Sequence, residues 1–119
     1  IIGDALFLSD KFLEERTADA KNLVKALVEA NKLWMADQDK YLALVSEKWG
    51  WPEEEIAATM TTVELYDDTK QKVLFGSGAA PGEIYEYISK ASDLWLKSDI
   101  ISKGIDAKQI IDPSLINGL

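Results

Sequence analysis

The side chains of this 119-residue chain that could do chemistry are carboxylates, lysines, tyrosines and hydroxyls, because the sequence contains no His and no Cys. Imidazole bases, thiolate nucleophiles, disulfides and zinc sites with nitrogen or sulfur ligands are therefore excluded. Carboxylates gather in three places, at Asp37 and Asp39, at 53–55, and at Asp67 and Asp68. Each group stands where a helix start needs a capping oxygen or negative charge, whereas a hard cation needs several converging oxygens. We expect no metal, no cofactor and no catalytic residue.

The glycine-rich stretch 76–82 precedes a predicted helix, and helix N-termini attract anions. No Lys-Ser/Thr pair follows the glycines, although a phosphate cradle of the P-loop type requires one. Ser77 with Lys90 or Lys97 would have the residue types of a Ser/Lys dyad, but nothing in their spacing specifies one. An ordinary flexible loop is the better interpretation of this stretch.

The chain has four tryptophans, and two of them fall on apolar helix faces. Trp34 and Trp95 are therefore predicted to lie in the core, where an aromatic ring buries a large apolar area. Trp51 stands between Gly50 and Pro52 in a turn and has no periodic reason to be inside. It is a candidate for docking a partner or another domain, and the alternative is an ordinary scattered apolar residue on the surface.

The composition is 47% hydrophobic and 29% charged, which is typical of one globular domain, so residues 1–119 are interpreted as a single domain or fragment. With 13 basic and 21 acidic residues the formal net charge is -8. Such a surface repels phosphate backbones and anionic lipids, so nucleic acid is not an expected partner. The first residue is Ile1, and no basic region of a signal peptide follows it, which suggests a processed chain or an excised piece.

Apolar residues recur at three- and four-residue spacings in three long stretches, and capping residues, prolines and glycines mark shorter helices. Long helices are expected over about 20–35, 40–50 and 82–97, and short ones over 11–16, 52–60, 69–75 and 114–117. The apolar run Ala5–Leu8 also fits the start of a helix but is interpreted as a strand. The short connection 37–39 favours a helical hairpin. The predicted fold class is mainly α, a helical bundle or hairpin with at most one or two short strands.

These features follow one another in an order that resembles that of a known protein family. The segments that carry the match are 5–16, 18–30, Trp34, 37–47 and 50–54, and later Phe75-Gly76, 82–84, 98–101 and 110–112. Together they resemble the C-terminal portion of the nitrate/sulfonate/taurine-type solute-binding proteins that serve ABC importers. The chain departs from the family at Thr17-Ala18, where a proline is common, and at Ser98-Asp99, where a glycine is common. The resemblance is a pattern of apolar positions and turns and contains no catalytic signature.

The resemblance implies a two-lobed α/β architecture of the periplasmic-binding-protein type, in which a small ligand lies between the lobes. The ligand, anionic or sulfonate-like, would be captured without chemical change and passed to an ABC permease. It also implies a missing N-terminal lobe and a periplasmic or extracellular location as a lipoprotein. By the same analogy Ser9 and Asp10 would lie near the ligand cleft. A Ser9 hydroxyl could donate to an anion, whereas Asp10 would repel one and is better suited to capping a helix.

One assembly and two alternative functions are also considered, and the last of them comes from the resemblance. Apolar helix faces without the companion lobe favour self-association, so a homodimer is expected. The chain could instead be a helical interaction module that presents Trp51 to another protein. A third alternative is an enzyme related to thiamine-pyrimidine biosynthesis, but that resemblance implies histidine-centred chemistry, which a chain without histidine cannot supply.

Overall fold

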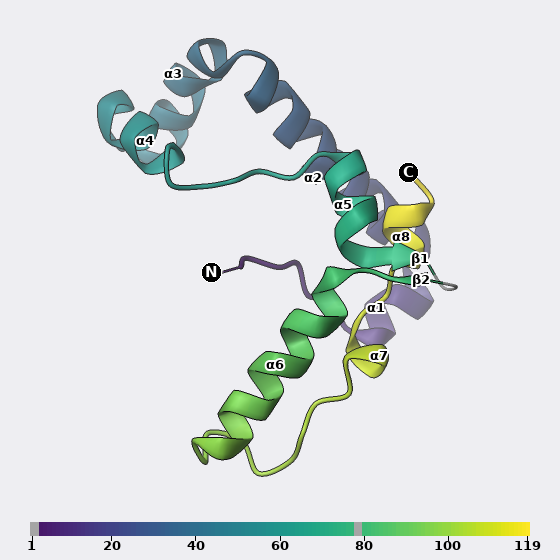
Figure 1. The fold of residues 1–119 in the computed structure, drawn as a ribbon. Helices are drawn as coiled ribbons and strands as arrows, with labels where there is room; N and C mark the ends of the chain where they lie inside the picture. Colours follow the sequence, from purple (N-terminus) through teal and green to yellow (C-terminus); the bar gives the residue numbers. More distant parts are fainter. Residues whose placement is uncertain (1–2, 78–79) are drawn as a thin grey trace.

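The computed structural model describes residues 3–77 and 80–119, and the chain is mainly helical (Figure 1). The described residues form eight helices and one antiparallel pair of two-residue strands. The helices are α1 (Asp10–Glu15), α2 (Thr17–Ala36), α3 (Gln38–Trp49), α4 (Glu53–Met60), α5 (Asp68–Phe75), α6 (Glu83–Lys97), α7 (Ala107–Ile110) and α8 (Ser114–Asn117), and the strands are β1 (Gly76–Ser77) and β2 (Ala80–Pro81). The predicted mainly helical fold with no more than two short strands is confirmed.

Local chemistry explains where four of the eight helices begin and where α3 ends. A short polar side chain accepts a hydrogen bond from an amide of the first turn, which the helix itself cannot pair. The pairs are Ser9 with Phe12, Asp37 with Lys40, Asp67 with Lys70 and Asp106 with Lys108. The sequence-predicted capping roles of the Asp37 and Asp67 carboxylates are therefore confirmed. Gly50 ends α3 with a left-handed backbone, φ 72°, which glycine adopts without a steric penalty.

The main core forms around the first half of α2. Ala20, Val24 and Val28 are buried there at four-residue intervals, so they share one face of the helix. The short α8 packs on both α2 and α5 and contributes the buried Ile116. The Asn117 side chain donates to the Gly76 carbonyl at 3.0 Å and so ties α8 to the strand pair.

The remaining helices form two arms that leave this core in different directions (Figure 1). In the α3–α4 arm the two helices pack on each other over Ile56, which is 2% exposed. The α6 arm consists of α6 and the irregular segment 98–106, which returns along it to α7. Ser92 of α6 is buried and its Oγ accepts a hydrogen bond from the Ile105 amide at 2.8 Å. In the view of Figure 1 the segment 3–9 runs into the space between the arms.

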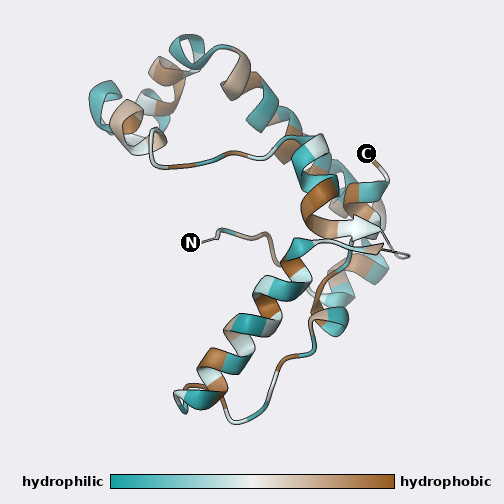
Figure 2. Ribbon diagram, viewed as in Figure 1, coloured by the Kyte–Doolittle hydropathy of each residue, from teal (hydrophilic) through white to brown (hydrophobic). Residues whose placement is uncertain are grey.

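The resulting molecule is open for its length. Its radius of gyration is 16.8 Å, against about 13.5 Å for a compact domain of 119 residues. Its accessible surface is 9031 Å², against roughly 6,400 Å² for a folded monomer of this size. About 2,600 Å² more surface is therefore exposed than a compact fold would leave. Several large hydrophobic side chains are exposed, among them Leu94 and Trp95 of α6, a helix on which Figure 2 shows brown, hydrophobic positions between hydrophilic ones.

Two sequence predictions are wrong. Ala5–Leu8 is not a strand but an irregular segment, and Phe7 is 84% exposed. A strand needs a neighbour for its amides and carbonyls, and the described part of the chain places none beside this run. Trp95, predicted to lie in the core, is instead 40% exposed. Trp34 is half-buried.

The glycine-rich stretch 76–82 is more ordered than the predicted plain loop. Its described ends form β1 and β2, with Gly76 opposite Pro81 and Ser77 opposite Ala80, while Gly78 and Ala79 lie outside the described residues. Gly76 has a φ of 68°, and a Cβ on it would overlap the Ala80 carbonyl. A Cβ on Gly82 would likewise overlap the Leu74 carbonyl. Both glycines therefore allow two backbones to come together where no side chain fits.

Candidate functional site

Ser9 and Asp10, predicted from the resemblance to lie near a ligand cleft, stand at the start of α1 on the surface. The Ser9 Oγ accepts a hydrogen bond from the Phe12 amide at 3.2 Å. Asp10 is the first residue of the helix, where a carboxylate is favoured by the positive end of the helix dipole. Neither residue lines the cavities described below. Their local role is to start α1.

Trp51, the predicted docking residue, is 49% exposed, and the neighbouring Trp49 is 65% exposed. Their rings meet edge to face, with centroids 5.8 Å apart and planes at 81°. The Ser46 hydroxyl donates to the Trp51 carbonyl at 2.6 Å, and with the left-handed Gly50 it fixes the turn that places the two rings together. Sequence reasoning missed Trp49 because it continues the helical pattern of α3. The spacing of two tryptophans around a glycine was the available signal.

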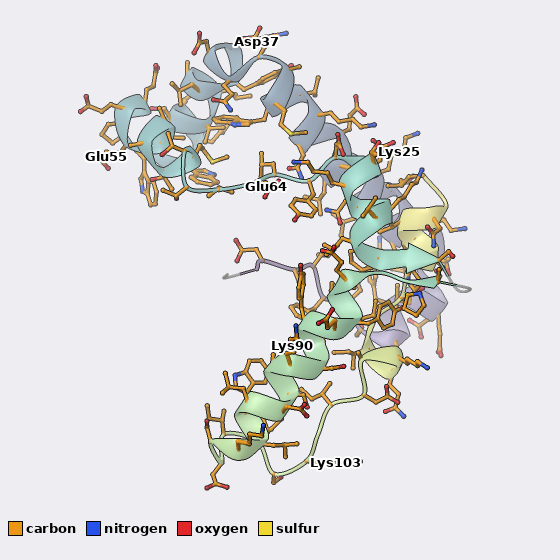
Figure 3. The ribbon with its side chains drawn as sticks, in the orientation of Figure 1. Lys25, Asp37, Glu55, Glu64, Lys90 and Lys103 are labelled. Atoms are coloured by element: carbon orange, nitrogen blue, oxygen red, sulfur yellow. The ribbon has the colours of Figure 1, made fainter. Side chains whose placement is uncertain are left out.

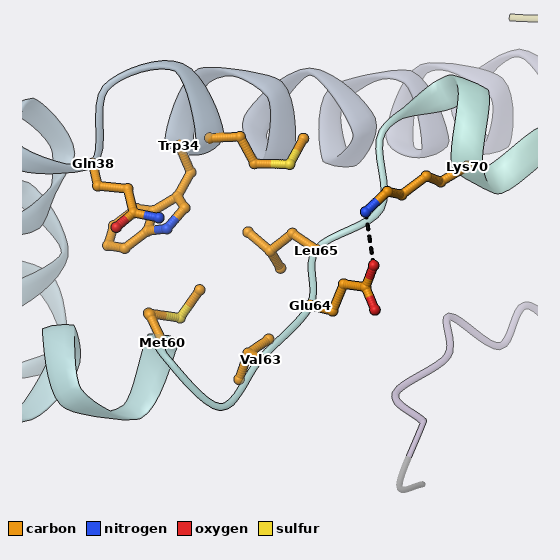
Figure 4. A pocket seen from close by; sticks show the side chains of 8 residues that line it. Trp34, Gln38, Met60, Val63, Glu64, Leu65 and Lys70 are labelled. Atoms are coloured by element: carbon orange, nitrogen blue, oxygen red, sulfur yellow. Dashed lines mark hydrogen bonds and ion pairs between the residues drawn. The ribbon is translucent and has the colours of Figure 1, made fainter.

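A small cleft lies where the end of α2 and the start of α3 meet the irregular segment 61–67, which leads from α4 to α5 (Figure 4). We call it the Trp34 cleft. Its volume is about 200 Å³, and it is lined by Trp34, Met35, Gln38, Met60, Val63, Glu64, Leu65 and Lys70. The sequence did not reveal it, because segment 61–67 has no periodicity and its apolar residues reach the cleft only through tertiary packing.

The indole nitrogen of Trp34 is the unusual atom of this cleft. It is buried, and it has no hydrogen-bond partner among the described residues. In Figure 4 the nitrogen edge of the ring is turned toward Met60 and Leu65, and Gln38 lies beside the ring. A buried donor without an acceptor destabilises a protein by about 1–3 kcal/mol. The donor therefore lies inside the packing of this region without an acceptor among the described residues.

Polar contacts hold the segment 61–67 over α2. The Asn31 side-chain amide donates to the Tyr66 carbonyl at 3.1 Å. Next to this contact along the chain, the Lys32 ammonium lies 3.0 Å from a carboxylate oxygen of Asp68. The hydrogen bond between them holds the pKa of Asp68 below its ordinary value and raises the pKa of Lys32. Since both side chains are partly exposed, the pair aligns the segment more than it stabilises the fold.

A second ion pair closes one end of the Trp34 cleft. The Lys70 ammonium lies 2.7 Å from a carboxylate oxygen of Glu64, drawn as a dashed line in Figure 4. The hydrogen bond to Glu64 raises the pKa of Lys70. The same two residues border a second hollow of about 240 Å³, lined by Glu64, Tyr66, Thr69, Lys70, Val73, Leu74 and Glu83. Because the two charges neutralise each other, neither hollow presents a free cation to an anionic ligand.

The described residues bring no set of three or more carboxylates together in a way that could hold a metal ion. Among the helices of the described part of the chain, none is both long and apolar enough to span a bilayer. The charged groups are spread over the molecule: Figure 3 shows Asp37 and Glu55 at the outer end of the α3–α4 arm, and Lys90 and Lys103 on the α6 arm. Comparison of the chain with protein-family models, with curated proteins and with solved structures found no match.

Proposed function

We propose that this chain is the helical portion of an extracytoplasmic solute-binding protein, which captures a small anionic or sulfonate-like ligand for an ABC permease without changing it chemically. The proposal joins the sequence resemblance to one structural observation, the open shape. The surface in excess of a compact fold, about 2,600 Å², is some three times what each partner contributes to a standard protein interface, about 800 Å². A companion lobe would use this surface.

The exposed apolar residues support the same proposal. Tyr87, Leu94 and Trp95 of α6 are 46%, 61% and 40% exposed, although they fall on the helical face predicted to be buried. Covering them would bury apolar area, at about 25 cal/mol for each Å² removed from water. In the proposed whole protein the companion lobe packs on α6 and on the segment 3–9. The Ser9 hydroxyl then lies at the edge of the cleft between the lobes.

A ligand assay on the longer polypeptide tests this function. The segment encoded upstream of Ile1 is expressed together with residues 1–119, and thermal unfolding is followed with taurine, nitrate and a pyrimidine as probes. A ligand at 100 times its Kd stabilises the folded state by about 2.7 kcal/mol, so one probe raises Tm by several degrees. The absence of a shift with every probe contradicts the proposal.

Two substitutions of Ser9 separate ligand binding from helix capping. Ser9→Thr keeps both the capping oxygen and the hydroxyl proton, so it preserves the ligand-induced rise in Tm. Ser9→Asp keeps a capping oxygen but replaces the donor by a negative charge, so it abolishes the rise for an anion while leaving the free protein stable. Equal responses of the two variants would remove Ser9 from the binding site.

The Trp49–Trp51 pair favours a second candidate function, a helical interaction module. Two rigid, exposed rings are the kind of anchor that dominates protein interfaces. Their fluorescence should move to the blue when the upstream segment is added as a separate chain, and Trp51→Ala should weaken binding by about 30-fold, equivalent to 2 kcal/mol. Leu44, 50% exposed on the same helix, provides the control, since Leu44→Ala leaves an interface centred on the tryptophans intact. An unchanged affinity in Trp51→Ala would reject the module.

A further inference from the structure

Asn117 and Gly118, at the end of α8, form the dipeptide in which an asparagine side chain deamidates most readily. Glycine has no side chain to shield its nitrogen, and its backbone turns freely. The Gly118 nitrogen loses its proton and attacks Cγ of Asn117. The new N–Cγ bond closes a succinimide ring while the Cγ–Nδ2 bond breaks and ammonia leaves with the proton. Water then opens the ring at either carbonyl and leaves aspartate or isoaspartate.

The folded structure holds these two residues in a geometry that opposes the attack. Asn117 lies in α8, and a helical backbone turns the next nitrogen away from Cγ. The Gly118 N–H donates to the Ser114 carbonyl at 3.1 Å, which keeps its proton in place. The Asn117 side chain donates to the Gly76 carbonyl at 3.0 Å, which holds Cγ against β1. All three restraints are lost together when α8 opens.

Deamidation also destroys one of the contacts that restrain it. The Asn117 amide is the donor in the bond to Gly76, whereas an ionised carboxylate only accepts. Two acceptor oxygens then face each other, and a negative charge is added to a chain whose net charge is already -8. Because α8 packs on α2 and α5 and contributes the buried Ile116, its release uncovers part of the main core (Figure 1).

We propose that Asn117 is a deamidation site whose rate is set by the opening of α8, and that its conversion to aspartate or isoaspartate keeps α8 from packing back. Water is the only other reactant, so the core loosens with the age of the molecule. The proposal does not rest on the transport function, because every residue that it uses lies in this chain.

Peptide mapping by mass spectrometry, on the chain aged at mildly alkaline pH, tests the site. Asn22 and Asn31 are internal controls, because each is followed by a bulky side chain within α2 and should stay unconverted. Conversion at Asn117 should be about tenfold or more faster in urea, which corresponds to a free energy of about 1.4 kcal/mol for opening α8. Gly118→Ala shields the nitrogen with a methyl group and should slow conversion under both conditions. Equal rates in buffer and urea, or no faster conversion at Asn117 than at the two controls, overturns the proposal.

Asn117→Asp tests the consequence for α8, and Asn22→Asp is the matched control, since it adds the same charge at an exposed position of α2. The amides of residues 117 and 118 donate to the Pro113 and Ser114 carbonyls in the native chain. Their protection against hydrogen exchange should fall about tenfold in Asn117→Asp, the effect of one ordinary hydrogen bond, and stay native in Asn22→Asp. Protection in α6 should be the same in both variants. Native protection of the two amides in Asn117→Asp, or an equal loss throughout the chain, contradicts the proposed release of α8.

Discussion

The buried hydroxyl of Ser92 gives the sharpest test of how the α6 arm is held together. Ser92 is 3% exposed, and its Oγ accepts from the Ile105 amide at 2.8 Å. Ser92→Ala removes that acceptor and leaves the amide unpaired, at a cost of about 1–3 kcal/mol. The higher helix propensity of alanine offsets about 0.5 kcal/mol of this loss in stability. A net loss of about 1.5 kcal/mol lowers Tm by roughly 6 °C for a chain of this length.

Urea unfolding followed by circular dichroism at 222 nm measures this loss, and Ser89→Ala is the matched control. Ser89 lies on the same helix and is exposed, and its hydroxyl donates to the Tyr85 carbonyl at 2.9 Å. Since that carbonyl keeps water as an alternative partner, the control should change stability by no more than about 0.5 kcal/mol. Hydrogen exchange should accelerate at the Ile105 amide. If Ser92→Ala destabilises the protein no more than Ser89→Ala, the segment 98–106 is not anchored as described.

Three further predictions concern the core, the charges and the N-terminal segment. Gly82→Ala places a Cβ against the Leu74 carbonyl and should destabilise the fold by about 3 kcal/mol in urea unfolding, whereas Gly3→Ala, which meets nothing within 4 Å, should not. Pairing with Lys32 lowers the pKa of Asp68 in the folded protein. The ionised Asp68 therefore stabilises the fold above the pKa that it has in the unfolded chain, and this stabilisation is lost as the pH falls through its pKa in the folded protein. The Tm of the native chain should thus exceed that of Asp68→Asn at neutral pH, with the gap closing only in that acidic range; a gap unaffected by acid would refute the pairing. Phe7→Ser should leave Tm unchanged, since the ring is 84% exposed, and a clear fall in Tm would show that segment 3–9 is packed.

The starts of the helices could be predicted from the sequence because they depend on atoms a few residues apart. Ser9, Asp37 and Asp67 each bond to the amide three residues ahead, so the type and place of the residue are sufficient. The long helices were equally accessible, because periodicity reports an amphipathic face whatever covers it. The capping roles of the acidic groups, and hence the interpretation of these groups as structural, rest on the same local chemistry.

The segment that packs on each apolar helix face could not be predicted, since it lies far away in the chain. On α6 the irregular segment 98–106 is the neighbour, and it brings an amide that needs an acceptor, so Ser92 is buried while Leu94 stays 61% exposed. For the same reason the Trp34 cleft could not be predicted, because its walls come from four helices and the segment 61–67, which meet only in the folded chain. Periodicity ranks residues by polarity and contains no information about such distant contacts.

The position of α8 has a consequence for synthesis on the ribosome. Ile116 completes a core whose first members, Ala20 and Val24, emerge more than ninety residues earlier. Until residue 116 has left the exit tunnel, the part of α2 on which α8 packs stays uncovered. Contacts between such distant parts of a chain form slowly, because a long loop must close first. Between the synthesis of α2 and that of α8 the nascent chain therefore exposes apolar surface, and a translational pause shortly after α5 should increase its aggregation.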